Sequence, residues 1–116
     1  MSRITRHGSN AILSNAVEYH GFVFTAGLTA DDLSEDVTGQ TRQVLAKIDA
    51  ALELCGTDKT RLLQAQIWLK DIRDRDAVNK VWTAWLPEGG APARACVEAN
   101  MADPRHLVEI MVVACR

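Results

Sequence analysis

The sequence predicts an α+β fold in which one mixed β-sheet carries two helices on the same face. Three observations support this prediction: an early hairpin pattern, two helical periodicities, and strand-like runs that follow each helix. The predicted order is therefore β-β-α-β-α-β-β. Strands that are separated by a helix should run parallel, and right-handed crossovers can place both helices on one face.

The first two strands are predicted at residues 16–19 and 22–26, where apolar and β-branched side chains dominate. They flank His20-Gly21, a pair that fits the tight turn of a hairpin. Residues 27–35 carry turn-forming and acidic side chains and are expected to form a loop.

The first helix is predicted from Val37 to Cys55, because apolar residues recur there at three- and four-residue steps. Ser34 or Asp36 is placed to cap its start. Gly56 fits the position just past its end, where a left-handed backbone is common.

The second half of the chain is predicted to contain three strands and one helix. Residues 63–70 alternate in polarity as a strand, and residues from about 73 to 86 carry one apolar helical stripe. The Pro-Glu-Gly-Gly stretch at 87–90 ends that helix. Two closing strands are predicted at about 93–99 and 107–115.

The last predicted strand, 107–115, is apolar at both alternating sets of positions, as expected of a strand buried on both sides. With both helices on one face, the other face of the sheet is left uncovered by this chain. The sequence therefore predicts a homo-oligomer in which another copy covers that face.

Length and composition limit the classes of function. The 116 residues suit one domain, 1–116, and a net charge of −2 argues against nucleic acid as the main partner. No apolar stretch is long enough to span a membrane, and residues 1–8 lack the apolar core of a signal peptide. A cytoplasmic location is the expectation.

The cysteines and histidines suggest no metal site. Cys55, Cys96 and Cys115 are odd in number and widely spaced, so neither a disulfide framework nor a zinc motif is indicated. The three histidines show no ligand spacing and no pairing with a nucleophile. They are His7, His20 and His106.

Two charged residues interrupt the closing strands and are the main candidates for chemistry. Burying the charged side chain of Arg94 or Glu109 costs free energy unless the charge is paired within the protein or used in binding or catalysis. Arg94 can grip a carboxylate or form an ion pair with Glu98 or Glu109. Glu109 can activate a water or form a salt bridge across an oligomer interface. Asn79 can be a site residue or an exposed polar residue.

Several stretches resemble the RidA family, also called the YjgF or L-PSP endoribonuclease-like family, over nearly the whole chain. The most specific is Pro-Ala-Arg-Ala-Cys-Val-Glu at 92–98, and its distance to Val-Glu-Ile at 108–110 also matches. Phe-Thr-Ala-Gly at 24–27 and Val-Asn at 78–79 are the others. The resemblance implies a chorismate-mutase-like fold and a homotrimer with a barrel-like core and sites in clefts between subunits.

The resemblance also implies an activity and the residues that perform it. Members hydrolyse reactive 2-imino or enamine acids, such as 2-iminobutanoate and 2-iminopropanoate, to 2-oxo acids and ammonia without a cofactor or metal. Arg94 matches the arginine that binds the substrate carboxylate. Asn79 matches a polar residue near the site. Glu109 matches the acid that activates the attacking water. Cys96 matches a position whose backbone helps to hold the substrate or that water.

Two departures concern the wall of the implied substrate pocket, to which Ala26 and Gly27 belong. Many imine-hydrolysing members have serine where this chain has Ala26, and a tyrosine in a Gly-Pro-Tyr stretch near which Leu13 falls. We interpret this as a retained reaction with altered substrate preference or reduced rate. The alternative is a non-catalytic protein that binds a small carboxylate such as a 2-oxo acid. Ribonuclease or chaperone action has little physical support in an acidic chain.

Overall fold

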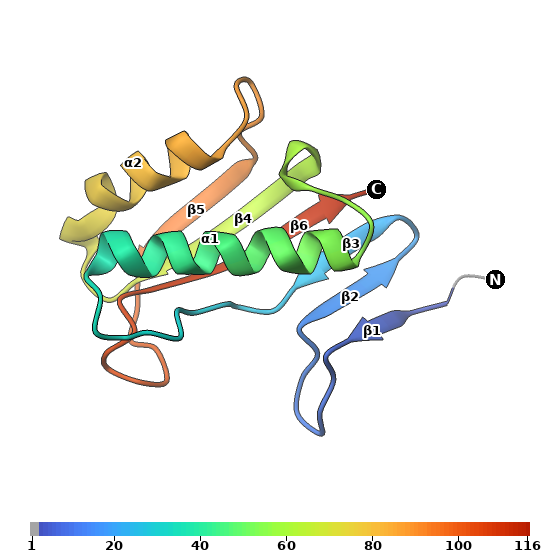
Figure 1. Ribbon diagram of the computed structural model, residues 1–116, viewed down its shortest axis with the longest axis horizontal. Coiled ribbons are helices and arrows are strands. Elements are labelled where there is room, and N and C mark those ends of the chain that lie inside the picture. The colour runs from blue at the N-terminus through green and yellow to red at the C-terminus, as the bar shows by residue number, and fades with distance from the viewer. Residues whose placement is uncertain (1–2) are drawn as a thin grey trace.

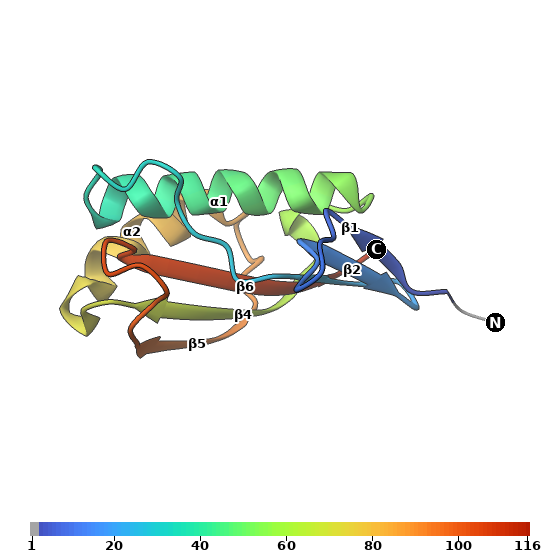
Figure 2. The same cartoon turned by 90° about the horizontal axis from the view of Figure 1, so that it is seen from below.

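The computed structural model describes residues 3–116 and shows one six-stranded sheet with two helices on one face (Figures 1 and 2). Met1 and Ser2, part of the start at 1–8 considered above, lie outside the described residues. The strands are β1 (Thr5–His7), β2 (Ala16–Tyr19), β3 (Phe22–Thr25), β4 (Leu62–Leu69), β5 (Ala93–Glu98) and β6 (Val108–Cys115). The helices are α1 (Val37–Leu54) and α2 (Arg75–Trp85). The predicted α+β class is confirmed.

The strand order across the sheet is β1-β2-β3-β6-β4-β5, so the last strand lies in the interior of the sheet. β6 is antiparallel to both β3 and β4, which therefore run in the same direction, as predicted for strands joined through a helix. They are not neighbours, however, because β6 lies between them. Among the described strands, only β4 and β5, which are joined through α2, form a parallel pair of neighbours.

The short strand β1 was not predicted. It pairs antiparallel with β2 at the edge of the sheet, with Thr5 opposite Glu18 and His7 opposite Ala16. Its three residues are polar and largely exposed, so no alternation of apolar side chains marks them as a strand. Pairing with β2 alone creates this strand.

The ends of the helices follow local capping rules. The Asp36 carboxylate accepts a hydrogen bond from the Gly39 N–H at 2.9 Å, which caps α1. Gly56 has φ +76°, the left-handed conformation expected just past a helix end. The second helix begins at Arg75 instead of Arg73, because a 3₁₀ turn over Ile72–Asp74 precedes it.

The helix-covered face of the sheet holds the core. From α1, Val44, Ile48 and Leu52 are fully buried against this face, to which β4 and β6 contribute alternate residues. These strand residues are Ala65, Ile67, Leu69, Val108, Ile110, Val112 and Ala114. Burying side chains of this size supplies most of the driving force for folding, at about 1.5–3 kcal/mol each.

No helix of residues 3–116 lies over the opposite face of the sheet, as Figure 2 shows. Phe22, Phe24, Tyr19 and Val97 are each more than 40% exposed there. We refer to it below as the open face. No helix among the described residues is long and apolar enough to cross a membrane.

Candidate active site

Arg94 points to the helix-covered face, because it pairs with Ala65, a buried residue of that face. Its Nη1 donates to Oδ1 of Asn79 on α2 at 2.8 Å. The guanidinium carbon lies 5.8 Å from the ring centroid of Trp82, one helical turn further along α2. An amide and an aromatic face therefore hold the guanidinium in place.

No carboxylate among the described residues forms an ion pair with Arg94. Glu98, the partner considered from the sequence, instead accepts a hydrogen bond from the backbone N–H of Ile72 at 3.0 Å. Because Asn79 takes up only part of the donor capacity of the guanidinium, Arg94 retains N–H groups for a carboxylate.

Glu109 points to the open face, because it pairs with Trp68 on β4. The side chain is half-buried, and no described residue forms a hydrogen bond or ion pair with its carboxylate. With Trp68, Asn100, Met101 and neighbouring alanines it lines a hollow of about 250 Å³. A carboxylate without an internal partner beside a hollow is suited to accept a proton from a water.

Gly27 lies directly against the Glu109 carboxylate. A Cβ atom at Gly27 would collide with Glu109 Oε2, so only glycine fits at this position without a shift of the acid. The backbone there is fixed by a bridge in which Leu28 and Ile110 exchange hydrogen bonds of 2.9 and 3.1 Å. This contact places Gly27, one of the residues expected from the sequence, beside the candidate acid.

The neighbouring Thr25 and Ala26 supply no hydroxyl to the open face. The Thr25 hydroxyl donates to the Ala26 carbonyl at 2.9 Å and accepts from the Val112 N–H at 3.0 Å. Thr25 is only 5% exposed, so this hydroxyl serves the core. Leu13 lies exposed in the loop between β1 and β2, and Tyr19 packs edge-on against His20.

Cys96 lies two residues beyond Arg94 on β5 and shares its face, since it pairs with Ile67. Burial raises the pKa of its thiol, and the positive charges of Arg94 and Arg75 oppose this only in part. A protonated thiol is a poor nucleophile. β5 is an edge strand, however, so its outer side presents backbone N–H and C=O groups to a ligand.

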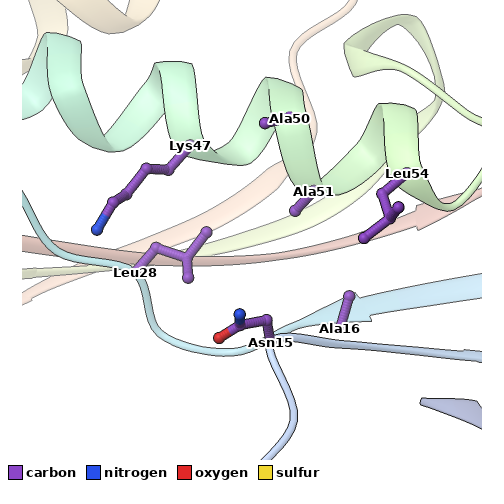
Figure 3. A pocket seen from close by; sticks show the side chains of 7 residues that line it. All are labelled: Asn15, Ala16, Leu28, Lys47, Ala50, Ala51 and Leu54. Carbon is purple, nitrogen blue, oxygen red and sulfur yellow. The ribbon is translucent and has the colours of Figure 1, made fainter. Parts of the chain in front are cut away.

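A different hollow, of about 290 Å³, lies between α1 and the loop around Leu28 (Figure 3). Its walls are mostly alanine and leucine side chains. The one charged residue, Lys47, donates to the Thr29 carbonyl at 2.8 Å and to Asp31 at 2.7 Å. Because this amine is already paired, the hollow offers little that could orient a substrate.

Arg94 and Glu109 are not brought together within one chain, because they lie on opposite faces of the sheet. Any site that uses both side chains therefore needs a second chain. Trp82 was not singled out as a candidate from the sequence: it lies within the apolar stripe predicted for residues 73 to 86, yet it also lies against Arg94. Its position three residues after Asn79, on the same helix face, was the available signal.

Comparison with known proteins identifies the family. The family model described as endoribonuclease L-PSP matches residues 4–116. This chain belongs to the endoribonuclease L-PSP family. It is 38% identical over 111 residues to a RutC family protein of Haemophilus ducreyi, covering 96% of this chain and 95% of that protein. It is 39% identical to the RutC family protein YoaB of Escherichia coli, covering 96% of each.

A solved structure supports the same assignment. A YjgF family protein from Neisseria meningitidis is 40% identical, with a TM-score of 0.93 over 98% of this chain and 95% of that chain. The resemblance to the RidA, YjgF and L-PSP family is therefore confirmed. In this endoribonuclease L-PSP family member, the candidate site residues lie on α2, β5, β6 and the segment after β3.

Proposed function

We propose that this protein hydrolyses small 2-imino or enamine acids to 2-oxo acids and ammonia, in a site formed between two copies of the chain. The proposal rests on one observation: neither Arg94 nor Glu109 has an oppositely charged partner among the described residues. Arg94 is held by Asn79 and Trp82 but has no acid partner among the described residues, and Glu109 is half-buried with no cationic partner among them.

The proposed site requires an oligomer. The open face carries exposed phenylalanine, tyrosine and valine side chains, which a second copy would cover. In a cyclic assembly, the β5 edge of one subunit can meet the open face of the next. We propose a homotrimer in which Arg94 of one subunit and Glu109 of its neighbour flank one cleft.

The reaction needs few groups. Arg94 binds the substrate carboxylate through two N–H donors, and the outer backbone of Cys96 helps to hold the substrate or the attacking water. Glu109 accepts a proton from that water as its oxygen bonds to C2 of the imine, and the C=N electron pair moves to nitrogen. The reacting imine carries a proton on nitrogen, so this addition gives a neutral amino alcohol. Glu109 passes its proton to the amino nitrogen, and ammonia leaves as the C2–O double bond forms and the hydroxyl proton passes back to Glu109.

Ala26 and Gly27 form the wall of the proposed pocket beside Glu109. This wall carries no hydroxyl from Thr25 or Ala26, since the Thr25 hydroxyl is bound within the core. We expect this wall to favour an apolar substrate side chain over a hydroxylated one, because neither residue 25 nor residue 26 offers it a hydroxyl group.

A coupled assay tests the proposal. An amino-acid oxidase generates 2-imino acids from a panel of amino acids, a trap competes for the imine, and 2-oxo acid formation is followed. Arg94→Ala should lower kcat/KM by roughly 100-fold, the effect of about 2.7 kcal/mol of charge-assisted binding. Arg105→Ala is the matched control, because Arg105 pairs with Asp103 on the surface.

Absence of acceleration by a correctly assembled oligomer, with every imine in the panel, would overturn the enzymatic proposal. Calorimetry with 2-oxo acids then tests the alternative, a non-catalytic protein that binds small carboxylates. That alternative requires saturable binding that Arg94→Ala removes.

A further inference from the structure

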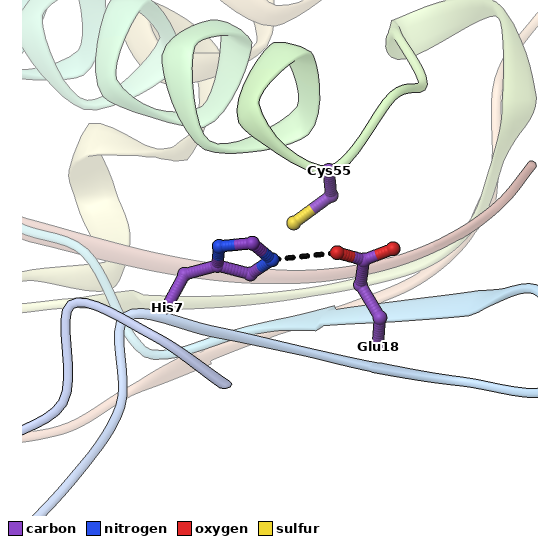
Figure 4. Close-up of side chains that lie close together, drawn as sticks. All are labelled: His7, Glu18 and Cys55. Carbon is purple, nitrogen blue, oxygen red and sulfur yellow. Dashed lines mark hydrogen bonds and ion pairs between the residues drawn. The ribbon is translucent and has the colours of Figure 1, made fainter. Parts of the chain in front are cut away.

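Three side chains that the proposed reaction does not use converge beneath the end of α1 (Figure 4). They come from β1, β2 and the residue that caps α1: His7, Glu18 and Cys55. His7 Nε2 lies 2.5 Å from Glu18 Oε2, and a ligand atom from each of the three residues lies within 4.8 Å of the others. This cluster is far along the sheet from β5, because β1 and β5 form its two edges.

The cluster is sheltered but reachable. The side chains of His7 and Glu18 are 20% and 14% exposed, and Cys55 is 2% exposed. The imidazole and carboxylate therefore form the outer wall through which an ion can enter, and the thiol forms the floor. This is the arrangement of a small polar site and not of a surface charge pair.

The negative end of a helix dipole and the Glu18 carboxylate favour a cation at the cluster, and the Arg116 guanidinium partly opposes it. The C-terminal end of α1 carries the negative end of the helix dipole, and its last turn contains no basic residue. The guanidinium of Arg116 lies 3.4 Å from Glu18 Oε1, which leaves Oε2 directed at His7. Arg116 thus orients the carboxylate while the other oxygen remains available as a ligand.

We propose that His7 Nε2, Glu18 Oε2 and Cys55 Sγ are the three protein ligands of a zinc ion whose fourth position is open to water. Imidazole, carboxylate and thiolate are all ligands that Zn²⁺ accepts, and three protein ligands plus a water is a known zinc arrangement. The carboxylate and thiolate charges balance the ion. Binding releases the thiol proton to solvent and leaves the imidazole proton on Nδ1.

The geometry requires only a small adjustment. In a tetrahedral site with bonds of about 2.0–2.3 Å, neighbouring ligand atoms lie roughly 3.5 Å apart. His7 and Glu18 would separate by about 1 Å as the ion replaces the hydrogen bond between them, and the thiol would move inward. The ion would tie β1, which pairs only with β2, to the end of α1.

This inference goes against the sequence-based expectation of no metal site. No motif spacing joins His7, Glu18 and Cys55, which lie on three separate elements. Their proximity exists only once β1 pairs with β2 and α1 packs across the sheet.

Metal titration tests the site directly. Full-length protein, freed of metal by a chelator, is titrated with Co²⁺ and then with Zn²⁺. We expect one Co²⁺ per chain, an absorption band from thiolate-to-cobalt charge transfer, and loss of that band when Zn²⁺ displaces Co²⁺. Zn²⁺ should also raise the Tm, because it binds the folded state.

Variants assign the ligands. Cys55→Ser should remove the charge-transfer band, and His7→Gln and Glu18→Gln should each weaken Zn²⁺ binding by about tenfold or more. Cys115→Ser is the matched control and should leave band and affinity unchanged. Circular dichroism checks the fold of each variant, and if Cys55→Ser does not fold, the other two variants decide.

Two results would overturn the zinc proposal: no charge-transfer band in the native chain, or a band and Tm shift that persist undiminished in the ligand variants. Either result would leave the cluster as a hydrogen-bonded His-Glu pair beside a thiol. Neither bears on the proposed imine hydrolysis, whose candidate residues lie on α2, β5, β6 and the segment after β3.

Discussion

Arg94 and Glu109 lie on opposite faces of the same sheet, because Arg94 pairs with Ala65 whereas Glu109 pairs with Trp68. Side chains alternate along a strand, so no rotamer change can bring the two groups to one face. A reaction that needs both groups must therefore take one from each of two chains. The first prediction uses this relationship.

Mixing two inactive variants should restore activity. Arg94→Ala and Glu109→Gln each disable every cleft of their own homo-oligomer. After unfolding and refolding as an equal mixture, a cleft is intact when its arginine comes from the Glu109→Gln chain and its acid from the Arg94→Ala chain. Random assembly makes about a quarter of the clefts intact, so about a quarter of native activity should return.

The control for this experiment is each variant refolded alone, which should stay inactive. Native mass spectrometry establishes that mixed oligomers form. If they form and activity does not return, the two residues do not act across a subunit boundary.

Gly27→Ala should displace the Glu109 carboxylate. The new Cβ would clash with Oε2, and because this atom ends a flexible, half-buried side chain, we expect the carboxylate to move aside at a cost in stability below the about 1–3 kcal/mol typical of overpacking in a core. We expect lower stability in urea and a reduced kcat. Adding Glu109→Ala to Gly27→Ala should recover most of the lost stability but none of the activity, because it removes the clashing group. Equal stability losses in the presence and absence of Glu109 would contradict the contact.

Asn79→Asp should weaken substrate binding more than Asn79→Ala. The amide oxygen of Asn79 accepts one N–H of Arg94 at 2.8 Å, and an aspartate there would pair with the guanidinium that the substrate needs. We expect KM to rise by roughly tenfold, the equivalent of about 1.4 kcal/mol. Asn10→Asp is a matched control, since Asn10 accepts only from backbone N–H groups of its own loop. An unchanged KM would show that Arg94 does not bind substrate.

In the metal-free protein, alkylation of Cys55 and Cys96 should be slow at neutral pH. Burial raises the pKa of both thiols above the usual value of 9.0. Their contribution to stability is complete below pH 9 and is lost as the pH rises through the raised values, because the unfolded chain releases these protons first. Iodoacetamide labelling followed by mass spectrometry should show both sites reacting mainly above pH 9. The denatured chain is the control, and fast labelling of folded protein at pH 7 would contradict the prediction.

The sequence predicted those elements whose residues carry a local signal. The Asp36 cap, the apolar spacing from Val37 and the left-handed Gly56 lie at the observed ends of α1. β1 could not be predicted from its own residues because its side chains are polar. Its strand conformation depends on pairing with β2. The interior position of β6 was consistent with its apolar composition, but composition cannot say which strands flank it.

For the candidate site, the sequence shows which side chains of one strand share a face. It does not show which faces of two different strands coincide. The sequence placed Arg94 and Glu109 inside strands and marked both as costly to bury. Whether they share a face depends on the register of β4 with each neighbour, which no local pattern encodes. The contact of Gly27 with Glu109 and the approach of Trp82 to Arg94 depend on the same long-range register.

The interior position of β6 also determines when the sheet can form. β6 is synthesised last of the six strands, yet it supplies the only link between β3 and β4. Until it inserts, the hairpin of β2 and β3 and the pair of β4 and β5 are two separate ribbons with unpaired edges. Such non-local pairing slows folding. The sheet is therefore completed only after β6 itself has been synthesised, and until then the unpaired edges of β3 and β4 are the places where non-native strand pairing can start.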